Sequence, residues 1–298
     1  MDLHQLWSIL STPDNVPIVL LALAVPFYSW YGLRQAFAND RLIAQLEADP
    51  EMARTHHRKT QPLRPEWDRE VHVWPYLLRI EFLAAIIVTV ILLVWSILLN
   101  APLEEPANPA LTMNPSKAPW YFVGLQELLV YFDPWLAGVV IPLLIIGGLM
   151  AIPYIDTNPL GSGYYTFRQR KGAILTFLFG FFALWLTMIF IGVFVRGPGW
   201  MWFWPGTTWD HNRLIFEVNR DLPFGALFLA AYLALAAWGI HKLLTRSTFD
   251  RKLYARMSRL QYLAMQFFLV LMLAVPVKIL LRLLFRIKYI WVTPWFNL

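Results

Sequence analysis

One carboxylate stands out in the stretch NPSKAPWYFVGLQELLVYFDP, which begins at Asn114 and is rich in Trp, Tyr and Phe. Glu127 follows Trp120 by seven residues, so in a helix the two side chains lie on nearly the same face, two turns apart. A carboxylate in such apolar surroundings can take up a proton and pass it on. The alternative is an interfacial carboxylate paired with Lys117 or with an arginine of another subunit.

The other acids near this stretch favour structural roles. Asp133 directly precedes Pro134, an arrangement typical of a residue that caps the following helix with its side-chain oxygen. Glu104 and Glu105 lie in a Pro-rich loop, where we expect them to face solvent. No metal site is predicted in this chain, and the absence of cysteine excludes thiolate-ligated clusters and zinc fingers.

The composition places these residues in a membrane protein. Of 298 residues, 58% are apolar and only 15% are charged. A soluble domain has roughly 45–50% apolar and about 25% charged residues. The net charge of +6 is not gathered into a basic patch with interleaved aromatic residues, which argues against nucleic-acid binding.

Six apolar segments approach the roughly 20 residues that a helix needs to cross a bilayer core about 30 Å thick. We expect all six to be helices, because a lone strand cannot satisfy its backbone in lipid. In the last segment, Lys278 and Arg282 suggest that its second half lies along the interface. The segments are Pro17–Phe37, Leu77–Leu99, Trp135–Ile155, Gly172–Val195, Pro223–Leu244 and Tyr262–Phe285.

The basic residues predict the orientation. Segments 34–79, 157–171 and 242–259 hold 17 of the 25 Lys and Arg residues. By the positive-inside rule these segments face the cytoplasm, which places both termini and the APWYF loop on the outer side. We therefore expect a multi-pass protein of a bacterial inner membrane.

Two longer connections have distinct compositions. Residues 39–73 are polar with mixed charge, which predicts a cytoplasmic amphipathic helix followed by a proline-punctuated linker. Residues 197–222 are rich in tryptophan beside turn residues, which is typical of an interfacial aromatic belt.

From Trp74 onward the order of features becomes specific. WPYLLRIEFL opens a span, PLEEPANPALTMNPSKAPWYF follows it, and FDPWLAGVVIPLLIIGGLMAIPYID and RQRKGAILTFLFGFFALWLTMIFIG form two more spans. This order resembles the C-terminal part of cytochrome b, which occurs as a separate small subunit, subunit IV, in split bc-type quinol oxidoreductases. In that family a PANP turn precedes a Pro-Glu-Trp-Tyr-Phe motif. The resemblance covers residues 72–205 and implies a core of three helices.

The resemblance implies a quinol oxidation site on the positive side of the membrane. Trp120, Tyr121 and Phe122 match the aromatic residues of the family motif and would form the wall of the pocket. The motif's glutamate is replaced by Pro119, and its proline by Ala118.

The lost glutamate matters because quinol oxidation releases two protons, and the site needs a base close to a ring hydroxyl. Proline cannot accept a proton. We therefore expect Glu127 to act as the replacement catalytic base, since carboxylates within membranes usually mark function.

A second site is implied on the negative side. Many cytochrome b proteins carry an acidic residue that contacts quinone near the start of the first of these helices, six residues after a proline. Glu81 follows Pro75 by six residues, and Arg79 matches a position that is often basic. Ordinary flanking charges at the membrane surface are the alternative for this pair.

The resemblance also implies the partners. Two b haems need two pairs of facing histidines, and among the histidines only His241 falls at the end of a predicted span. We expect the b haems in a separate cytochrome b N-terminal subunit, the iron-sulfur cluster in a Rieske protein, and a c-type cytochrome as a further partner, in a dimeric complex. Menaquinone or ubiquinone would bind at the subunit interface.

These observations predict an all-α polytopic subunit of a quinol:cytochrome c oxidoreductase that couples electron transfer to proton translocation. Its expected parts are 1–71, a first span with a linker; 72–205, the cytochrome b C-terminal-like domain; and 206–298, two further spans and a tail. The alternatives are a non-catalytic structural subunit and a transporter or channel subunit. A transporter would favour repeats and polar residues at the middle of its spans, which we do not find.

Overall fold

The computed structural model describes residues 3–56, 73–100, 103, 106–159, 164–212, 219–220, 222–246, 251–252, 254–295 and 297–298. Within these ranges the chain is helical and forms no β-strand, only isolated bridges, which confirms the predicted all-α class. Glu104, Glu105 and most of the predicted proline-punctuated linker lie outside the described residues.

The chain divides into two compact units. The first holds residues 1–7, 112–160 and 167–298, and the second holds residues 8–111 and 161–166. The division into 1–71, 72–205 and 206–298 stays a prediction.

Six helical segments are long and apolar enough to cross a membrane, as the hydropathy of the sequence predicts. Each overlaps one of the six predicted spans, and the largest difference is at the C-terminal end of the first. The segments are Pro13–Ala48, Val73–Leu98, Leu136–Ile155, Phe167–Val195, Gly225–Leu244 and Arg259–Phe285.

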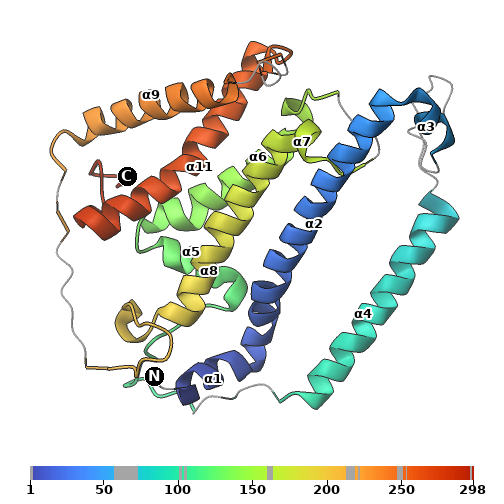
Figure 1. Ribbon diagram of the computed structural model, residues 1–298. Coiled ribbons are helices and arrows are strands. Elements are labelled where there is room, and N and C mark those ends of the chain that lie inside the picture. The colour runs from blue at the N-terminus through green and yellow to red at the C-terminus, as the bar shows by residue number, and fades with distance from the viewer. Residues whose placement is uncertain are drawn as a thin grey trace. The chain divides into compact units, whose positions relative to one another are not determined.

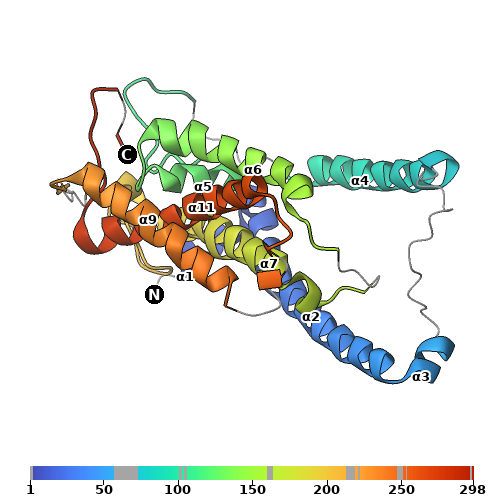
Figure 2. The ribbon, with the colours of Figure 1, turned by 90° about the horizontal axis from the view of Figure 1, so that it is seen from above.

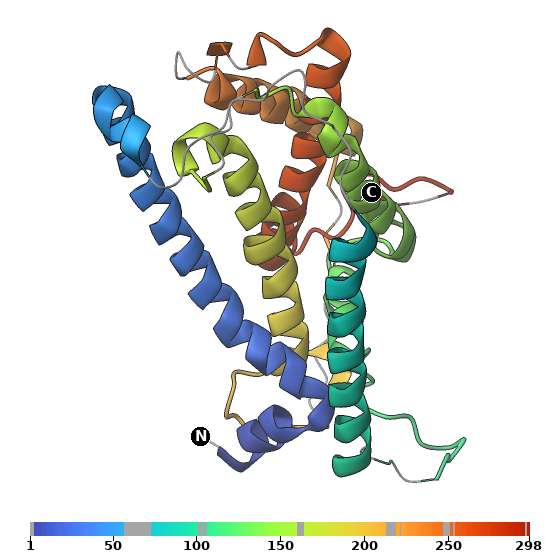
Figure 3. The ribbon, with the colours of Figure 1, turned by 90° about the vertical axis from the view of Figure 1, so that its right-hand side faces the viewer.

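The second unit is built on a long helix, α2, which corrects one prediction. The helix α2 runs without interruption from Val16 to Ala48, so no separate amphipathic helix begins near Asn39 (Figure 3). Alanine, leucine and glutamine in this region continue the helix because they have high helix propensity. The elements here are α1(Leu3–Ser11), which the two units share, η1(Pro13–Asn15), α2, α3(Pro50–Thr55), η2(Val73–Leu77) and α4(Leu78–Leu98).

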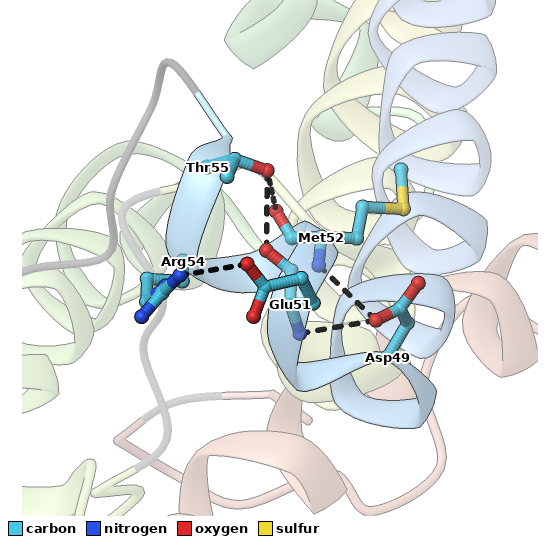
Figure 4. Close-up of polar contacts among 5 residues, drawn as sticks. All are labelled: Asp49, Glu51, Met52, Arg54 and Thr55. Atoms are coloured by element: carbon cyan, nitrogen blue, oxygen red, sulfur yellow. Dashed lines mark hydrogen bonds and ion pairs between the residues drawn. The ribbon is translucent and has the colours of Figure 1, made fainter.

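The short helix α3 begins with an N-cap at Asp49 (Figure 4). The Asp49 Oδ1 atom accepts from the backbone N–H groups of Glu51 at 3.0 Å and Met52 at 3.1 Å. Arg54 pairs with Glu51 at 2.8 Å, and the Thr55 hydroxyl donates to the backbone oxygen of Glu51 at 3.1 Å. These contacts end α2 at Asp49 and start a new helical turn, because the cap satisfies donors that a helix start leaves free.

Within its own unit, the helix α4 packs chiefly on the adjoining turn η2. No residue of its most apolar window is buried, although the mean hydropathy of that window is 2.6. Such a helix satisfies its backbone internally, but its side chains need lipid or another protein around them.

The first unit contains the remaining spans. Its elements are α5(Trp120–Leu128), η3(Leu136–Val140), α6(Ile141–Ile155), α7(Phe167–Phe177), η4(Leu178–Leu186), α8(Thr187–Phe190), η5(Ile191–Val195), η6(Pro198–Trp200), α9(Gly225–Leu244) and α11(Arg259–Phe285).

The short helix α5 packs against α8 and η5, at the end of the span Phe167–Val195 (Figures 1 and 2). Glycines permit the close approach. A Cβ atom on Gly124 would lie 3.0 Å from Ile189 Cγ1, and one on Gly192 would lie 2.9 Å from Val123 Cγ2. Small residues at helix contacts within membranes allow this packing. Beside this contact lies a core cluster of Leu128, Tyr131, Phe132, Ala137 and Met188.

The helix α11 lies against α9 and α6 (Figure 1). It continues unbroken to Phe285, past the two basic residues that suggested an interfacial second half. The Lys278 side chain is buried; its ammonium donates to the backbone oxygen of Lys288 and lies 5.5 Å from the centre of the Phe132 ring. The Lys278 side chain is therefore accommodated inside the protein, while the interfacial position of this half of the helix stays a prediction.

Candidate functional site

The aromatic triplet begins the helix α5. Pro119 is the residue before the first turn, with extended ψ of 150°, and Trp120 is the first helical residue. The Pro119 backbone oxygen accepts from the N–H groups of Phe122 at 2.8 Å and Val123 at 2.9 Å. A proline at this position has φ fixed near the helical value, and it lacks the N–H that would extend the helix toward its N-terminal side. The residue that replaces the family glutamate thus starts the helix that carries the triplet.

Side chains fasten the loop that precedes α5. Gln126 reaches back from α5 and accepts from the N–H of Ala118 at 2.8 Å, while its own amide donates to the oxygen of Ser116 at 2.8 Å. The Lys117 ammonium donates to the backbone oxygen of Val193 at 2.8 Å and lies 5.3 Å from the Trp209 ring centre. The position of the triplet is therefore fixed by contacts on both sides of Pro119.

Glu127 lies at the centre of a buried polar cluster. Its side chain is 0% exposed and accepts four hydrogen bonds. Arg196 donates through Nε to Oε2 at 2.8 Å and through Nη2 to Oε1 at 2.7 Å. The Tyr131 hydroxyl donates to Oε1 at 2.8 Å, and the Trp200 indole donates to Oε2 at 2.9 Å. A bidentate arginine pair with two further donors is the arrangement that compensates a buried carboxylate.

A tight turn places Arg196 and Trp200 against Glu127. Gly199 has φ of +65° and Trp200 has φ of +57°, so the chain reverses within a few residues after the span. The Arg196 Nη1 atom donates to the backbone oxygen of Trp200 at 3.0 Å, and the guanidinium carbon lies 5.6 Å from the Trp202 ring centre. The Asn114 Oδ1 atom accepts from the N–H of Gly199 at 2.6 Å. This contact ties the turn to the loop before α5.

Burial and charge shift the proton affinities in this cluster. Burial and the negative charge of Glu127 both raise the pKa of Tyr131. Burial disfavours the charged form of Arg196, but its hydrogen bonds and attraction to Glu127 outweigh this and raise its pKa. Burial lowers the pKa of Lys117 to about 8, and the charge of Glu127 opposes part of this change. Arg196 therefore stays a cation within the cluster. The nearby Lys117, with its pKa of about 8, titrates slightly above neutral pH.

Two rings of the triplet, those of Tyr121 and Phe122, are exposed on the same helix, whereas Trp120 is half-buried. Tyr121 is 50% exposed and Phe122 is 55% exposed, with ring centres 4.9 Å apart. The rings of Trp120 and Tyr121 meet edge to face at 5.6 Å. The short helix thus has an inner face fixed by Glu127 and an outer face of aromatic rings.

Comparison with known proteins supplies the family. Residues 106–195 match the family described as Cytochrome b(C-terminal)/b6/petD. This segment belongs to the cytochrome b C-terminal family. No curated protein and no solved structure matches the chain. The match contains the triplet and Glu127, and it ends one residue before Arg196. The family belongs to cytochrome bc and b6f complexes, which are oxidoreductases, and the segment that matches it lies among described helices that are long and apolar enough to cross a membrane several times.

The cytochrome b C-terminal domain brings together some of the predicted site residues. Glu127 is paired, as the alternative interpretation predicted, but its partner is Arg196 of the same chain rather than Lys117 or another subunit's arginine. The role of Glu127 as a base stays a prediction. Asp133 caps the next helix as predicted, since its Oδ1 accepts from the N–H of Trp135 at 3.1 Å.

Two residues of this cluster were missed by sequence reasoning. The orientation rule treats Arg196 as one of the few basic residues on the predicted outer side. The tryptophan-rich segment 197–222 predicts only an aromatic belt for Trp200. The available signal was a single arginine placed directly after an apolar span, because a charge at that position usually has a specific partner.

The two residues predicted for a negative-side quinone site lie in the other unit. Glu81 is in the first turn of α4, and Arg79 precedes it in the same turn. Both side chains are exposed, and neither has a polar partner within the part of the chain that the structure describes. Their role in binding quinone stays a prediction.

The described residues show no gathered metal ligands. No three His, Asp or Glu side chains within this part of the chain lie close enough to hold a metal ion. His241 contacts Tyr262 through its Nδ1 atom at 2.7 Å. The matched family is associated with haem and quinone binding in bc complexes, and the placement of the haems in partner subunits stays a prediction.

Proposed function

We propose that this chain is a subunit of a bc-type quinol:cytochrome c oxidoreductase and that Trp120, Tyr121 and Phe122 form one wall of its positive-side quinol oxidation site. The family match to residues 106–195 supports the general assignment. The two-faced helix α5 supports the site. Its rings are presented outward while its inner face is held by an ion pair that is 7% exposed at Arg196 and 0% exposed at Glu127.

The single observation that carries this proposal is the half-exposure of Tyr121 and Phe122 beside each other. A quinol ring is planar and apolar with two hydroxyl groups, and it packs well against aromatic faces. A site in a membrane complex needs such a surface where a second polypeptide can close the pocket. The fixed inner face of α5 keeps this surface in place, as a binding site requires.

Oxidation of a quinol to a quinone releases two electrons and two protons. The electrons would pass to a Rieske cluster and a b haem, both held by partner subunits. The residues of this chain bind and orient the ring and exclude water from it. Pro119 cannot accept a proton, and Glu127 could accept one only if its bidentate contact with Arg196 weakened. Glu127 is the proposed base, and in that role the proton competes with Arg196 for the carboxylate oxygens.

Glu127→Gln tests the base. Loss of a general base lowers turnover by about a hundredfold or more. We expect this loss, with an altered pH dependence, in complexes whose amount and b-haem spectrum match the wild type. Asp133→Asn is a matched control, because it removes a carboxylate six residues away and asparagine caps helices as well as aspartate. Wild-type turnover with unchanged pH dependence in Glu127→Gln would remove Glu127 from the catalytic role.

The subunit assignment has its own test. We expect the purified native assembly to show b-haem bands in reduced-minus-oxidised spectra and a Rieske signal in electron paramagnetic resonance. The absence of both would end the bc-type assignment. Glu81→Gln should slow quinone reduction on the other side of the membrane, if α4 carries the proposed negative-side contact.

A second candidate is a structural subunit without a catalytic base. One observation favours it: Glu127 already accepts four hydrogen bonds within its own chain. The resemblance, which implies that Pro119 replaces the glutamate of the family motif, points the same way. Tyr121→Leu separates the two functions. A raised KM for quinol supports the oxidation site, and unchanged kinetics supports the structural role.

A further inference from the structure

A row of three polar side chains lies between α9 and α11, outside the segment that matches the cytochrome b family. The His241 Nδ1 atom lies 2.7 Å from the Tyr262 hydroxyl, and the Gln266 Nε2 atom donates to the same hydroxyl at 2.8 Å. The sequence predicted no function for these two helices. The row shows that their contact also carries hydrogen-bonding groups.

The row enters the membrane from the side of the basic loop. His241 is exposed in the last turn of α9, close to the basic segment 242–259. Gln266 follows the first residue of α11, Arg259, by seven positions, which is about 10 Å along the helix axis. Tyr262 and Gln266 are four residues apart and share a helix face. The three groups therefore form a continuous polar line from the surface into the apolar region.

The inner end of the row has an acceptor that nothing within the described part of the chain satisfies. Gln266 is 8% exposed, and its Oε1 atom has no hydrogen-bond partner among the described residues. Buried polar atoms are nearly always hydrogen-bonded, and a dry, unpaired amide oxygen is costly. Water is the smallest donor that can reach such an atom, and a polar site with several partners can retain it.

The groups can pass a proton without leaving a charge behind. The orientation of the Gln266 amide leaves its Oε1 atom free to hold a water while Nε2 donates to the Tyr262 oxygen. In the tautomer that carries its proton on Nδ1, His241 also donates to this oxygen, and the tyrosine hydroxyl donates inward to that water. A proton given by water to His241 Nε2 is then matched by the Nδ1 proton moving to Tyr262, while the hydroxyl proton moves on to water beside Gln266. One proton enters and one leaves.

We propose that His241, Tyr262 and Gln266 line a hydrated path that carries protons into the membrane from the side of the basic loop. Its ligand is water and the excess proton. The use of these protons in quinone chemistry rests on the proposed function, whereas the hydration of the path does not.

Cysteine accessibility tests the hydration directly, because this chain has no cysteine of its own. Gln266→Cys is compared with Leu263→Cys, which changes a nearby apolar residue of the same helix that is 64% exposed. Only the thiolate reacts, and lipid suppresses its formation. We expect a small hydrophilic thiosulfonate reagent to label Gln266→Cys about tenfold faster than Leu263→Cys in the native assembly in nanodiscs, with the adduct located by mass. Equal or slower labelling of Gln266→Cys would overturn the path.

Proton movement is the second readout. In liposomes that contain the assembly and a pH-sensitive dye on the basic-loop side, Gln266→Leu and Tyr262→Phe should slow proton uptake several-fold, whereas Gln266→Glu should keep it. Normal uptake in both Gln266→Leu and Tyr262→Phe would overturn the relay. An assembly without quinol turnover would fail this second test but leave the labelling result intact, so the two proposals fail separately.

Discussion

The polar cluster around Glu127 and the helix α4 differ in how far their side chains are satisfied by contacts within the same chain. Within the cluster, every oxygen of a buried carboxylate is satisfied by groups of the same chain. In α4, the side chains of the most apolar window remain exposed, and Arg79 and Glu81 have no polar partner among the described residues. The first region is complete by itself, whereas the second depends on what surrounds it.

This difference indicates which parts of the protein the chain can fold without help. Charges inside a membrane protein are costly unless paired, so the cluster must assemble for this part of the unit to be stable. An apolar helix faces no such demand, because lipid tails solvate it as well as another protein does. Substitutions in the two regions should therefore differ in whether they damage the chain or only the assembly.

The largest effect is expected from Arg196→Met, which leaves Glu127 buried without its cation. Removing one partner of a buried pair costs about 3–5 kcal/mol. Unfolding in denaturant, followed by tryptophan fluorescence, measures it. The double variant Glu127→Leu/Arg196→Met should be less damaged than Arg196→Met alone, because no uncompensated charge remains. If the double variant is worse than both single variants, the stability of the cluster does not depend on charge pairing.

Ile189→Ala and Ile87→Ala compare the two regions with the same chemical change. Ile189 is 1% exposed where α8 meets α5, whereas Ile87 is 50% exposed on α4. We expect the first to lower the free energy of unfolding by about 2–4 kcal/mol through the cavity it leaves. The second should change it little in the isolated chain. A comparable loss at Ile87 within the purified assembly alone would show that a partner subunit covers α4.

Gly192→Ala should have a smaller effect of the same kind. The added Cβ atom would lie 2.9 Å from Val123 Cγ2 and 3.2 Å from the Val123 oxygen, so α5 must move. Overpacking of this kind costs about 1–3 kcal/mol. Gly138→Ala is the control, since a Cβ atom there meets nothing within 4 Å. If the midpoint temperature of thermal unfolding falls equally in both variants, the close approach at Gly192 is contradicted.

The smallest effect is a pH dependence at Lys117. Its pKa is about 8 in the folded chain because of burial, against about 10.4 for a free lysine. Between these values the unfolded chain binds more protons than the folded one, so stability rises with pH in this window. Lys117→Gln should remove this rise in unfolding midpoints measured from pH 7.5 to 10. The exposed Lys252→Gln serves as control and should leave the rise unchanged.

Much of the fold follows from local sequence, while the cluster does not. Runs of apolar residues sufficed to predict six helices, and the Asp133-Pro134 pair sufficed to predict a cap, because both depend on neighbouring residues. The contact between Glu127 and Arg196 joins positions 69 residues apart, and no spacing rule reaches across two helices. The exposure of α4 was equally hidden, since an apolar run has the same sequence whether lipid or protein surrounds it.

The end of α2 had a different cause of error. The charged residues beyond the first span predicted a separate amphipathic helix. Their helix propensity instead lets α2 continue to Ala48. Composition shifts mark where a helix leaves the membrane, and they do not mark where it stops.

The length of α2 has a mechanical consequence. Its 33 residues amount to about 50 Å of rod, and the hydrocarbon layer accounts for about 30 Å of that. About 20 Å of stiff helix therefore stands clear of the lipid and holds α3 at its tip. A force applied to that tip is converted by leverage into a change of tilt of the buried half, whereas a flexible tether of the same length would absorb it.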